Sequence, residues 1–160
     1  MSDSSSSPLS AAHGGEGGFP DNPPPPFQPS VRRGPFTTHN GPWYHWADET
    51  DFRQGVRLQQ RHCNGRGIAH GGFLSAFADG LTATAIFRQL RRGSVTMKLN
   101  TEFLRSAKAG DWLQGTAKLT RATRNMAFVE AYGWVGEAAE IAHDDLVFSA
   151  SAVFRLLEER

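Results

Sequence analysis

A long apolar segment without proline, residues 71–90, constrains the fold of this chain more than any other feature. Its apolar and small side chains recur at intervals of three and four residues, the spacing of one helical face: Phe73, Leu74, Phe77, Ala78, Leu81, Thr82 and Ala85. Arg91, Arg92 and Gly93 follow, and basic residues followed by glycine are typical of a helix end. A helix that is apolar around most of its circumference must be buried.

After Gly93 the pattern changes to the two-residue period of a β-strand, with Val95, Met97 and Leu99 alternating with polar residues. Three more strand-like runs follow, at residues 112–122, 126–136 and 146–157. The spacers 107–111, 123–125 and 137–145 are too short for crossover helices, so we expect consecutive strands to pair antiparallel.

These elements predict an α+β domain in which an antiparallel sheet wraps one long helix. A further short strand is predicted within Phe52–Gln60, interrupted by Gly55. Because the helix lacks a broad polar face, we expect a second copy of the chain to complete its cover.

The first 38 residues differ in composition from the rest, being rich in Ser, Gly and Pro, with four prolines at positions 23–26. Such a segment buries too little apolar surface to offset the entropy of ordering it. The sequence therefore predicts a disordered tail over residues 1–38 and a folded domain over residues 39–160. We favour a simple tether over a partner-docking motif as the role of the tail.

The overall charge and the single cysteine exclude several classes of protein. A net charge of +1, from 17 basic and 16 acidic residues, argues against nucleic acid as a partner. One cysteine, Cys63, cannot form an intrachain disulfide, and the amino terminus lacks the pattern of a secretory signal, so a cytoplasmic location is expected. The longest apolar run, residues 71–87, contains Asp79 and is too short for a membrane span.

The start of the predicted helix carries the residues best suited to chemistry. His70, Gly71 and Gly72 open it, and the free N–H groups of a first helical turn can donate to a carbonyl oxygen or an anion. Asp79 is the only charged residue between His70 and Arg88. A carboxylate on a buried helix needs a partner or a cleft; it is either catalytic or a satisfied core residue that caps another segment.

The spacing of these residues links the site to dimerisation. Nine residues at about 100° each place Asp79 roughly half a turn around the helix from His70. If two helices pack about a two-fold axis, the His70 turn of one chain faces Asp79 of the other.

A wider set of residues resembles a known family. The pattern comprises Asn64, Gly67, His70, Gly71, Gly72, Asp79, the strand Val95–Asn100, Phe103-Leu104-Arg105 and Gly110-Asp111. Over roughly residues 52–154 it resembles the hotdog-fold acyl-CoA thioesterases of the phenylacetate-degradation (PaaI-like) group. The resemblance implies a hotdog fold, hydrolysis of an acyl-coenzyme A thioester, and dimers that commonly pair into tetramers.

The resemblance also implies a role for each matching position. Asp79 would activate water or attack the thioester carbon, while the Gly71 N–H polarises the carbonyl group. His70 and Asn64 would come from the partner chain relative to that Asp79. A hydroxyl early in the next strand would orient the water; Thr96 fits best and Ser94 is the alternative.

The substrate is expected to meet residues outside this catalytic group. Coenzyme A carries phosphates, which basic residues at loop ends can bind. Gly72 is also expected to bind the substrate, because it has no side chain to obstruct the substrate's approach to the helix start. The candidate basic residues are Arg91, Arg92, Arg105, Lys108, Arg121 and Arg124, the last with Asn125 in a predicted hairpin turn. Phe73, Phe77 and Leu81 either line an acyl tunnel or, as we favour, pack in the core.

Three other interpretations have less support. A non-catalytic acyl-CoA sensor on the same fold would not need Asp79. Hotdog hydratases use an Asp-x-Asn-Pro-x-x-His loop, which does not occur in this sequence. Neighbouring His62 and Cys63 would point to opposite faces of an extended chain, so they make a poor catalytic pair.

The six histidines have no metal-ligand spacing, so neither a metal nor a separate cofactor is predicted.

Overall fold

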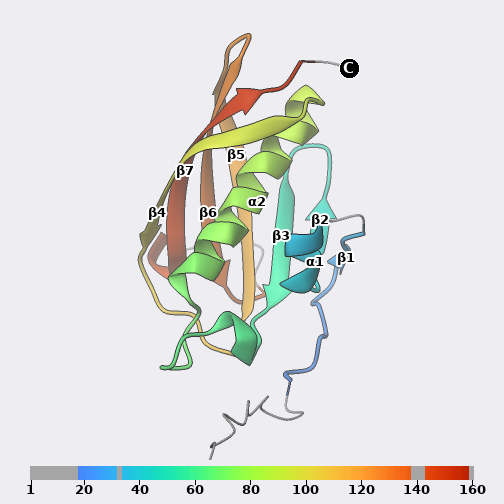
Figure 1. Cartoon of the computed structure of the whole chain (residues 1–160). Helices are drawn as coiled ribbons and strands as arrows, with labels where there is room; N and C mark the ends of the chain where they lie inside the picture. The colour runs from blue at the N-terminus through green and yellow to red at the C-terminus, as the bar shows by residue number, and fades with distance from the viewer. Residues whose placement is uncertain (1–17, 32–33, 138–142, 159–160) are drawn as a thin grey trace, which may run out of the picture.

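The computed structural model describes residues 18–31, 34–137 and 143–158. Within them a seven-stranded antiparallel sheet, in the order β1-β2-β3-β5-β6-β7-β4, curves behind one long helix, α2 (Figure 1). The strands are β1 (Gln28–Pro29), β2 (Tyr44–Ala47), β3 (Phe52–Arg57), β4 (Ser94–Phe103), β5 (Trp112–Ala122), β6 (Met126–Val135) and β7 (Leu146–Leu156). The helices are α1 (Pro35–His39) and α2 (Gly71–Leu90), with 3-10 turns at Gln60–His62 and His143–Asp145. The predicted α+β architecture is confirmed.

Helix α2 has the predicted bounds. His70 caps its start by accepting the Gly72 N–H at Nδ1 over 2.9 Å. It ends at Leu90, as predicted, because Arg91 adopts a left-handed conformation with φ 55°. The face toward the sheet is buried and consists of Phe73, Leu74, Phe77, Ala78, Leu81, Thr82, Ala85 and Ile86. Phe73, Phe77 and Leu81 therefore pack in the core, which is the role the sequence favoured.

The predicted pairing of consecutive strands is correct for β5, β6 and β7 but wrong for β4. Strand β4 pairs with β7 at the far edge of the sheet. The chain from β4 to β5 passes under the start of α2, where Ala107 is buried and its carbonyl accepts the Ala69 N–H at 2.8 Å. The curl of β5, β6 and β7 around the helix brings β7, rather than β5, to the edge of β4.

Strand β4 contains a bulge that the alternating sequence pattern concealed. Thr96 pairs with Phe154 and Lys98 with Val153, so Met97 has no partner. Paired residues share a face of the sheet, and Phe154 belongs to the core beneath α2. The extra residue therefore keeps Thr96 and Leu99 on the same, helix-facing side, although simple alternation would place all of Val95, Met97 and Leu99 together.

Gly55 does not interrupt its strand as predicted, because β3 runs through it. It pairs with Tyr44 on one side and Gln114 on the other. A Cβ atom at Gly55 would collide with the Trp112 indole, at 2.3 Å from Cζ2. This position requires glycine because the indole fills the space that a side chain would need.

The boundary predicted at residue 38 differs from the structure. Phe27 is buried against Tyr44 and Trp112, and β1 pairs with β2. The Phe27 N–H donates to the Pro24 carbonyl at 3.0 Å, so the proline run forms a turn on the sheet. The apolar area buried by these aromatic contacts offsets the entropy cost of ordering this part of the chain. Composition alone had indicated that this cost was too large to offset. Residues 1–17 of the predicted tail lie outside the described residues.

Among the residues that the structure describes, no helix has both the length and the apolar character needed to span a membrane.

Candidate active site

Asp79 and Thr96 meet between α2 and the edge strand β4. The Thr96 hydroxyl donates to Asp79 Oδ1 at 2.7 Å, and both residues are half-buried. The bulge at Met97 allows this contact because it keeps Thr96 on the helix-facing side of β4. Ser94, the alternative predicted for this place, is on the same side two residues earlier, opposite Leu156. Hydrogen bonding to Oδ1 leaves Asp79 Oδ2 able to accept from another group.

The first turn of α2 has one N–H group available for a ligand. The Gly72 N–H donates to His70 Nδ1, and those of Phe73 and Leu74 donate to the His70 carbonyl at 2.9 and 3.1 Å. The Gly71 N–H has no hydrogen-bond partner within the described part of the chain. Of the two glycines named from the sequence, Gly71 therefore presents the free donor.

Both glycines of this turn lie close to aromatic rings. A Cβ atom at Gly71 would lie 3.0 Å from Cε2 of Phe103, and one at Gly72 would lie 3.0 Å from His70 Nδ1. Because Nδ1 of His70 accepts the Gly72 N–H, the neutral imidazole carries its proton on Nε2, and the side chain is exposed. His70 thus both caps the helix and offers an N–H group to solvent.

Asn64 shapes the loop that leads into this turn. Its Oδ1 accepts the Arg66 N–H at 2.9 Å, and its carbonyl accepts the Gly67 N–H at 3.0 Å. Gly67 has φ 74°, a conformation that favours glycine. Asn64 is therefore a turn-forming residue here, whatever further part it has in a complete site.

His62 supports the turn from below, a role that sequence reasoning missed. It is 1% exposed, its ring stacks on Phe73 at 4.1 Å, and its carbonyl accepts the His70 N–H at 2.8 Å. Burial lowers the pKa of His62 to about 4. The neighbouring Cys63 is no candidate nucleophile, because burial raises the pKa of its thiol.

The Gly71 N–H and Asp79 of one chain are too far apart to act on one carbonyl group. Eight residues of helix separate them, which is about 12 Å along the axis. An oxyanion donor and an attacking group each need to lie about 3 Å from the reacting atoms. A single chain holds two half-sites, one with Gly71 and one with Asp79 and Thr96.

The basic residues proposed for the substrate do not form one group. Arg91 lies over the Phe87 ring at the end of α2, and the Arg92 guanidinium donates to the carbonyls of Arg124 and Leu157. Asn125 is next to Arg124, in the hairpin after β5, and its carbonyl accepts the Leu156 N–H. Arg105 follows β4 at the opposite end and forms an ion pair with Asp145 at 2.8 Å. Within one chain, the basic residues predicted to bind the CoA phosphates therefore form two separate groups, one at each end of β4.

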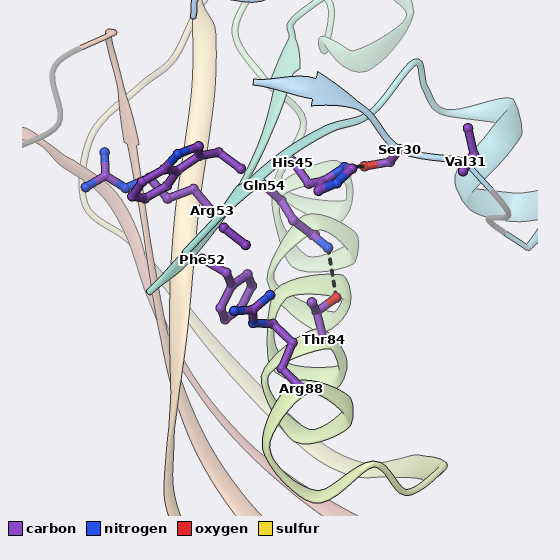
Figure 2. Close-up of a pocket in the computed structure, with 10 residues that line it drawn as sticks. Ser30, Val31, His45, Phe52, Arg53, Gln54, Thr84 and Arg88 are labelled. Atoms are coloured by element: carbon purple, nitrogen blue, oxygen red, sulfur yellow. Dashed lines mark hydrogen bonds between the residues drawn. The ribbon is translucent and has the colours of Figure 1, made fainter. Parts of the chain in front are cut away.

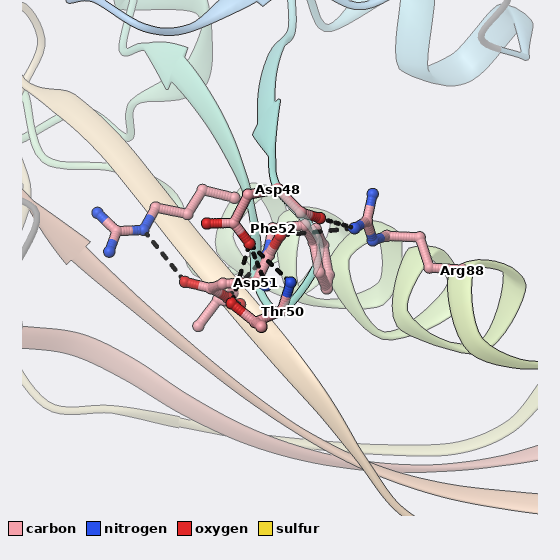
Figure 3. A network of polar contacts seen from close by, with 7 residues as sticks. Asp48, Thr50, Asp51, Phe52 and Arg88 are labelled. Atoms are coloured by element: carbon pink, nitrogen blue, oxygen red, sulfur yellow. Dashed lines mark hydrogen bonds and ion pairs between the residues drawn. The ribbon is translucent and has the colours of Figure 1, made fainter.

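Two hollows lie beside the C-terminal part of α2, around Arg88. One, of about 370 Å³, has a floor where Gln54 Nε2 donates to Thr84 Oγ1 at 2.8 Å (Figure 2). The other, of about 670 Å³, shares Phe52 and Arg88 with it. Arg88 donates to the carbonyls of Asp48 and Asp51, tying the β2–β3 turn to the helix (Figure 3). Neither hollow includes Gly71 or Asp79.

Asp48 organises the turn that Arg88 holds. Its Oδ1 accepts the N–H groups of Thr50 and Asp51 at 2.7 and 2.8 Å (Figure 3). The bond from Asp51, followed by those from Thr50, lowers the pKa of the Asp48 carboxyl.

No cluster of three potential metal ligands is found among the described residues.

Comparisons with known proteins identify the family and agree with the fold. The thioesterase superfamily model matches residues 66–142. A Pseudomonas aeruginosa protein named "putative esterase" is 37% identical over 138 residues, covering 84% of this chain and 98% of its own. A phenylacetic acid degradation-related protein from Ralstonia eutropha is 26% identical, with TM-score 0.63, over 78% of this chain and 92% of its own. A Bacillus halodurans protein solved with CoA shares the fold at 18% identity and TM-score 0.61, over 71% of this chain and 72% of its own.

We predict that acid weakens the support under the His70 turn. Unfolded His62 takes up a proton near pH 6.5, whereas the folded side chain does so only near pH 4. Stability is therefore lost as pH falls from 6.5 toward 4. Urea unfolding should show that the stability advantage of wild type over His62→Gln shrinks by roughly 2 kcal/mol from pH 7 to 4.5.

The exposed His39 provides the control, because His39→Gln should follow the wild-type pH dependence. Parallel curves for wild type and His62→Gln would contradict the buried, neutral state of His62.

Proposed function

The chain belongs to the thioesterase superfamily, and we propose that it hydrolyses acyl-coenzyme A thioesters to the free carboxylic acid and CoA. The coenzyme A in the Bacillus halodurans structure supports the choice of acyl carrier. The observation that carries the proposal is the pair of half-sites, a free Gly71 N–H and an Asp79 carboxylate bound to Thr96. Thioester hydrolysis needs both a donor for the carbonyl oxygen and a group that delivers water or attacks directly.

The proposed chemistry assigns one task to each group. The Gly71 N–H, at the positive end of a 20-residue helix, stabilises the negative charge that develops on the carbonyl oxygen. Asp79 either takes a proton from water as the water attacks the carbonyl carbon, or attacks that carbon itself. The carbon–sulfur bond then breaks and CoA leaves as a thiolate, which takes up a proton. Where Asp79 attacks the carbon itself, water then hydrolyses the acyl–Asp79 anhydride, which releases the carboxylic acid and restores the Asp79 carboxylate. Thr96 fixes one Asp79 oxygen, so that the other faces the substrate.

The separation of the half-sites favours a dimer with shared sites. Among the residues that the structure describes, no other element covers the face of α2 away from the sheet (Figure 1). Its residues are small or half-buried and permit a second helix to approach closely: Gly72, Ser75, Ala76, Asp79 and Ala83. A second copy of this chain fits that face because its own α2 presents the same small residues.

The contacts between α2 and β4 indicate how the two copies pair. Gly71 lies against Phe103, and Asp79 against Thr96. Ser75 lies midway between Gly71 and Asp79 on α2. A two-fold axis near Ser75 places the Gly71–Phe103 contact of one chain opposite the Asp79–Thr96 contact of the other. Strand β4 is the last in its sheet, so its free edge can pair antiparallel with the same strand of the partner subunit. Gly71 of one chain then faces Asp79 of the partner subunit.

The predicted site residues outside this pair fit the same arrangement. His70 Nε2 is exposed beside Gly71, and Asn64 lies in the loop before it. Both therefore belong to the half-site that carries Gly71, and they complete the site opposite Asp79 of the partner subunit.

Hydrolysis should depend on Asp79 and, to a smaller extent, on Thr96. We expect Asp79→Asn to lower kcat by at least about 100-fold and Thr96→Val by about 10-fold, measured as thiol release from a panel of acyl-CoAs. Thr120→Val is the control, because its hydroxyl bonds to the Phe128 carbonyl on another part of the sheet. Undiminished turnover by Asp79→Asn would reject the mechanism, and wild-type binding without turnover would identify a sensor instead.

The Gly71 N–H can be tested separately from the glycine itself. Gly71→Ala and Gly71→Pro both place a Cβ atom against Phe103, but only proline removes the N–H group. Proline is well tolerated at the first helical position, and His70 already has the extended ψ of 134° that proline requires before it. Gly71→Pro should lose about 100-fold more in kcat than Gly71→Ala. Equal losses would show that the N–H group does not act in catalysis.

A further inference from the structure

Phe19, in the N-terminal segment of residues 18–29, is held to the domain by a buried glutamine, Gln59. The Phe19 N–H donates to Gln59 Oε1 at 3.0 Å, and Gln59 Nε2 donates to the Phe19 carbonyl at 3.1 Å. Gln59 is 7% exposed, so these two bonds satisfy an amide that would be costly to bury unpaired. From here the N-terminal segment runs from the end of the domain where α2 begins up to β1 (Figure 1).

Gln59 also belongs to the turn that supports the start of α2. Its N–H donates to His62 Nδ1 at 3.1 Å, and its carbonyl accepts the His62 N–H at 2.9 Å. The His62 carbonyl in turn accepts the His70 N–H at 2.8 Å. A series of hydrogen bonds therefore connects residue 19 to the residue that precedes Gly71.

The Phe19 ring supports the second segment that borders the same turn. A Cβ atom at Gly110 would lie 2.8 Å from Cε1 of that ring, so the ring fills the space beside the glycine. Three residues earlier, the Ala107 carbonyl accepts the Ala69 N–H at 2.8 Å. Residue 19 thus contacts both of the segments that hold the chain where it enters α2.

We propose that Gln59 is a positioning residue for hydrolysis, because it ties the N-terminal segment to the turn that directs the Gly71 N–H. The inference rests on the proposed function. An oxyanion donor stabilises the transition state only when it points at the developing charge, and a displacement of about 1 Å can cost about 100-fold in rate. The Gly71 N–H makes no hydrogen bond within the described part of the chain, so its direction depends on the backbone of the His70 turn. Gln59 acts through this backbone and not by touching the substrate.

Gln59→Met tests the assignment because it keeps the length of the side chain and removes both bonds to residue 19. We expect kcat for acyl-CoA hydrolysis to fall about tenfold while KM stays within about twofold, since a misdirected donor weakens transition-state binding more than substrate binding. On a Gly71→Pro background, Gln59→Met should cause no further loss, because the N–H group through which it acts is already absent. A general loss of folded protein would instead lower kcat equally on both backgrounds.

Tyr44→Phe is the matched control. The Tyr44 hydroxyl also holds the N-terminal segment, by donating to Asp21 Oδ2 at 2.6 Å, but it does so from β2. This variant should leave kcat unchanged. Phe19→Ala provides a second test that leaves the buried amide intact. It should lower kcat about threefold, and that loss should also disappear on the Gly71→Pro background.

Unchanged kcat in folded Gln59→Met protein, or a tenfold loss that persists on the Gly71→Pro background, would overturn the assignment. If the wild type hydrolyses no thioester, the proposed function fails, and amide hydrogen exchange then tests the link itself. The Gly72 N–H, which donates to His70 Nδ1, should exchange about tenfold faster in Gln59→Met than in wild type or Tyr44→Phe. Equal exchange rates in the three proteins would overturn the link.

Discussion

The hydrogen bond between Thr96 and Asp79 is the interaction on which the rest of the site depends. It holds a carboxylate on a helix face that is otherwise small and apolar, where an unpaired charge would be costly. The bond exists because the bulge at Met97 keeps Thr96 turned toward α2. No other element of the described part of the chain covers the same face of α2, so the charge and the open face together favour a second chain as its cover (Figure 1).

Periodicity predicted the elements well because each depends on local residues. The bounds of α2 and β5 agree with the sequence, since both are long and strongly patterned. The order of β4 in the sheet was not predictable from connection length, because it depends on how far the later strands curl around the helix. The bulge was not predicted, because Val95, Met97 and Leu99 alternate regularly with polar residues in the sequence. Composition likewise concealed the burial of Phe27 among distant aromatic residues.

The sequence likewise predicted some features of the candidate site and not others. The motif pointed to Asp79 and to the His70 turn, but not to which N–H group of that turn is free. That followed from the hydrogen bonds that Gly72, Phe73 and Leu74 already make. The stacking of His62 on Phe73 and the approach of Phe103 to Gly71 depend on the folded chain, and no spacing rule reveals them. Basic residues were scattered along the chain, and only the fold separates those near Gly71 from those at the far end of α2.

We propose that each site takes its N–H donor and its carboxylate from different chains. The direct test joins a Gly71→Pro chain and an Asp79→Asn chain, carrying different tags, in one purified heterodimer. One of its two sites then combines Gly71 from one chain with Asp79 from the other, so thiol release should recover to about half the wild-type rate per dimer. A heterodimer that carries both tags and remains as inactive as either parent would contradict shared sites.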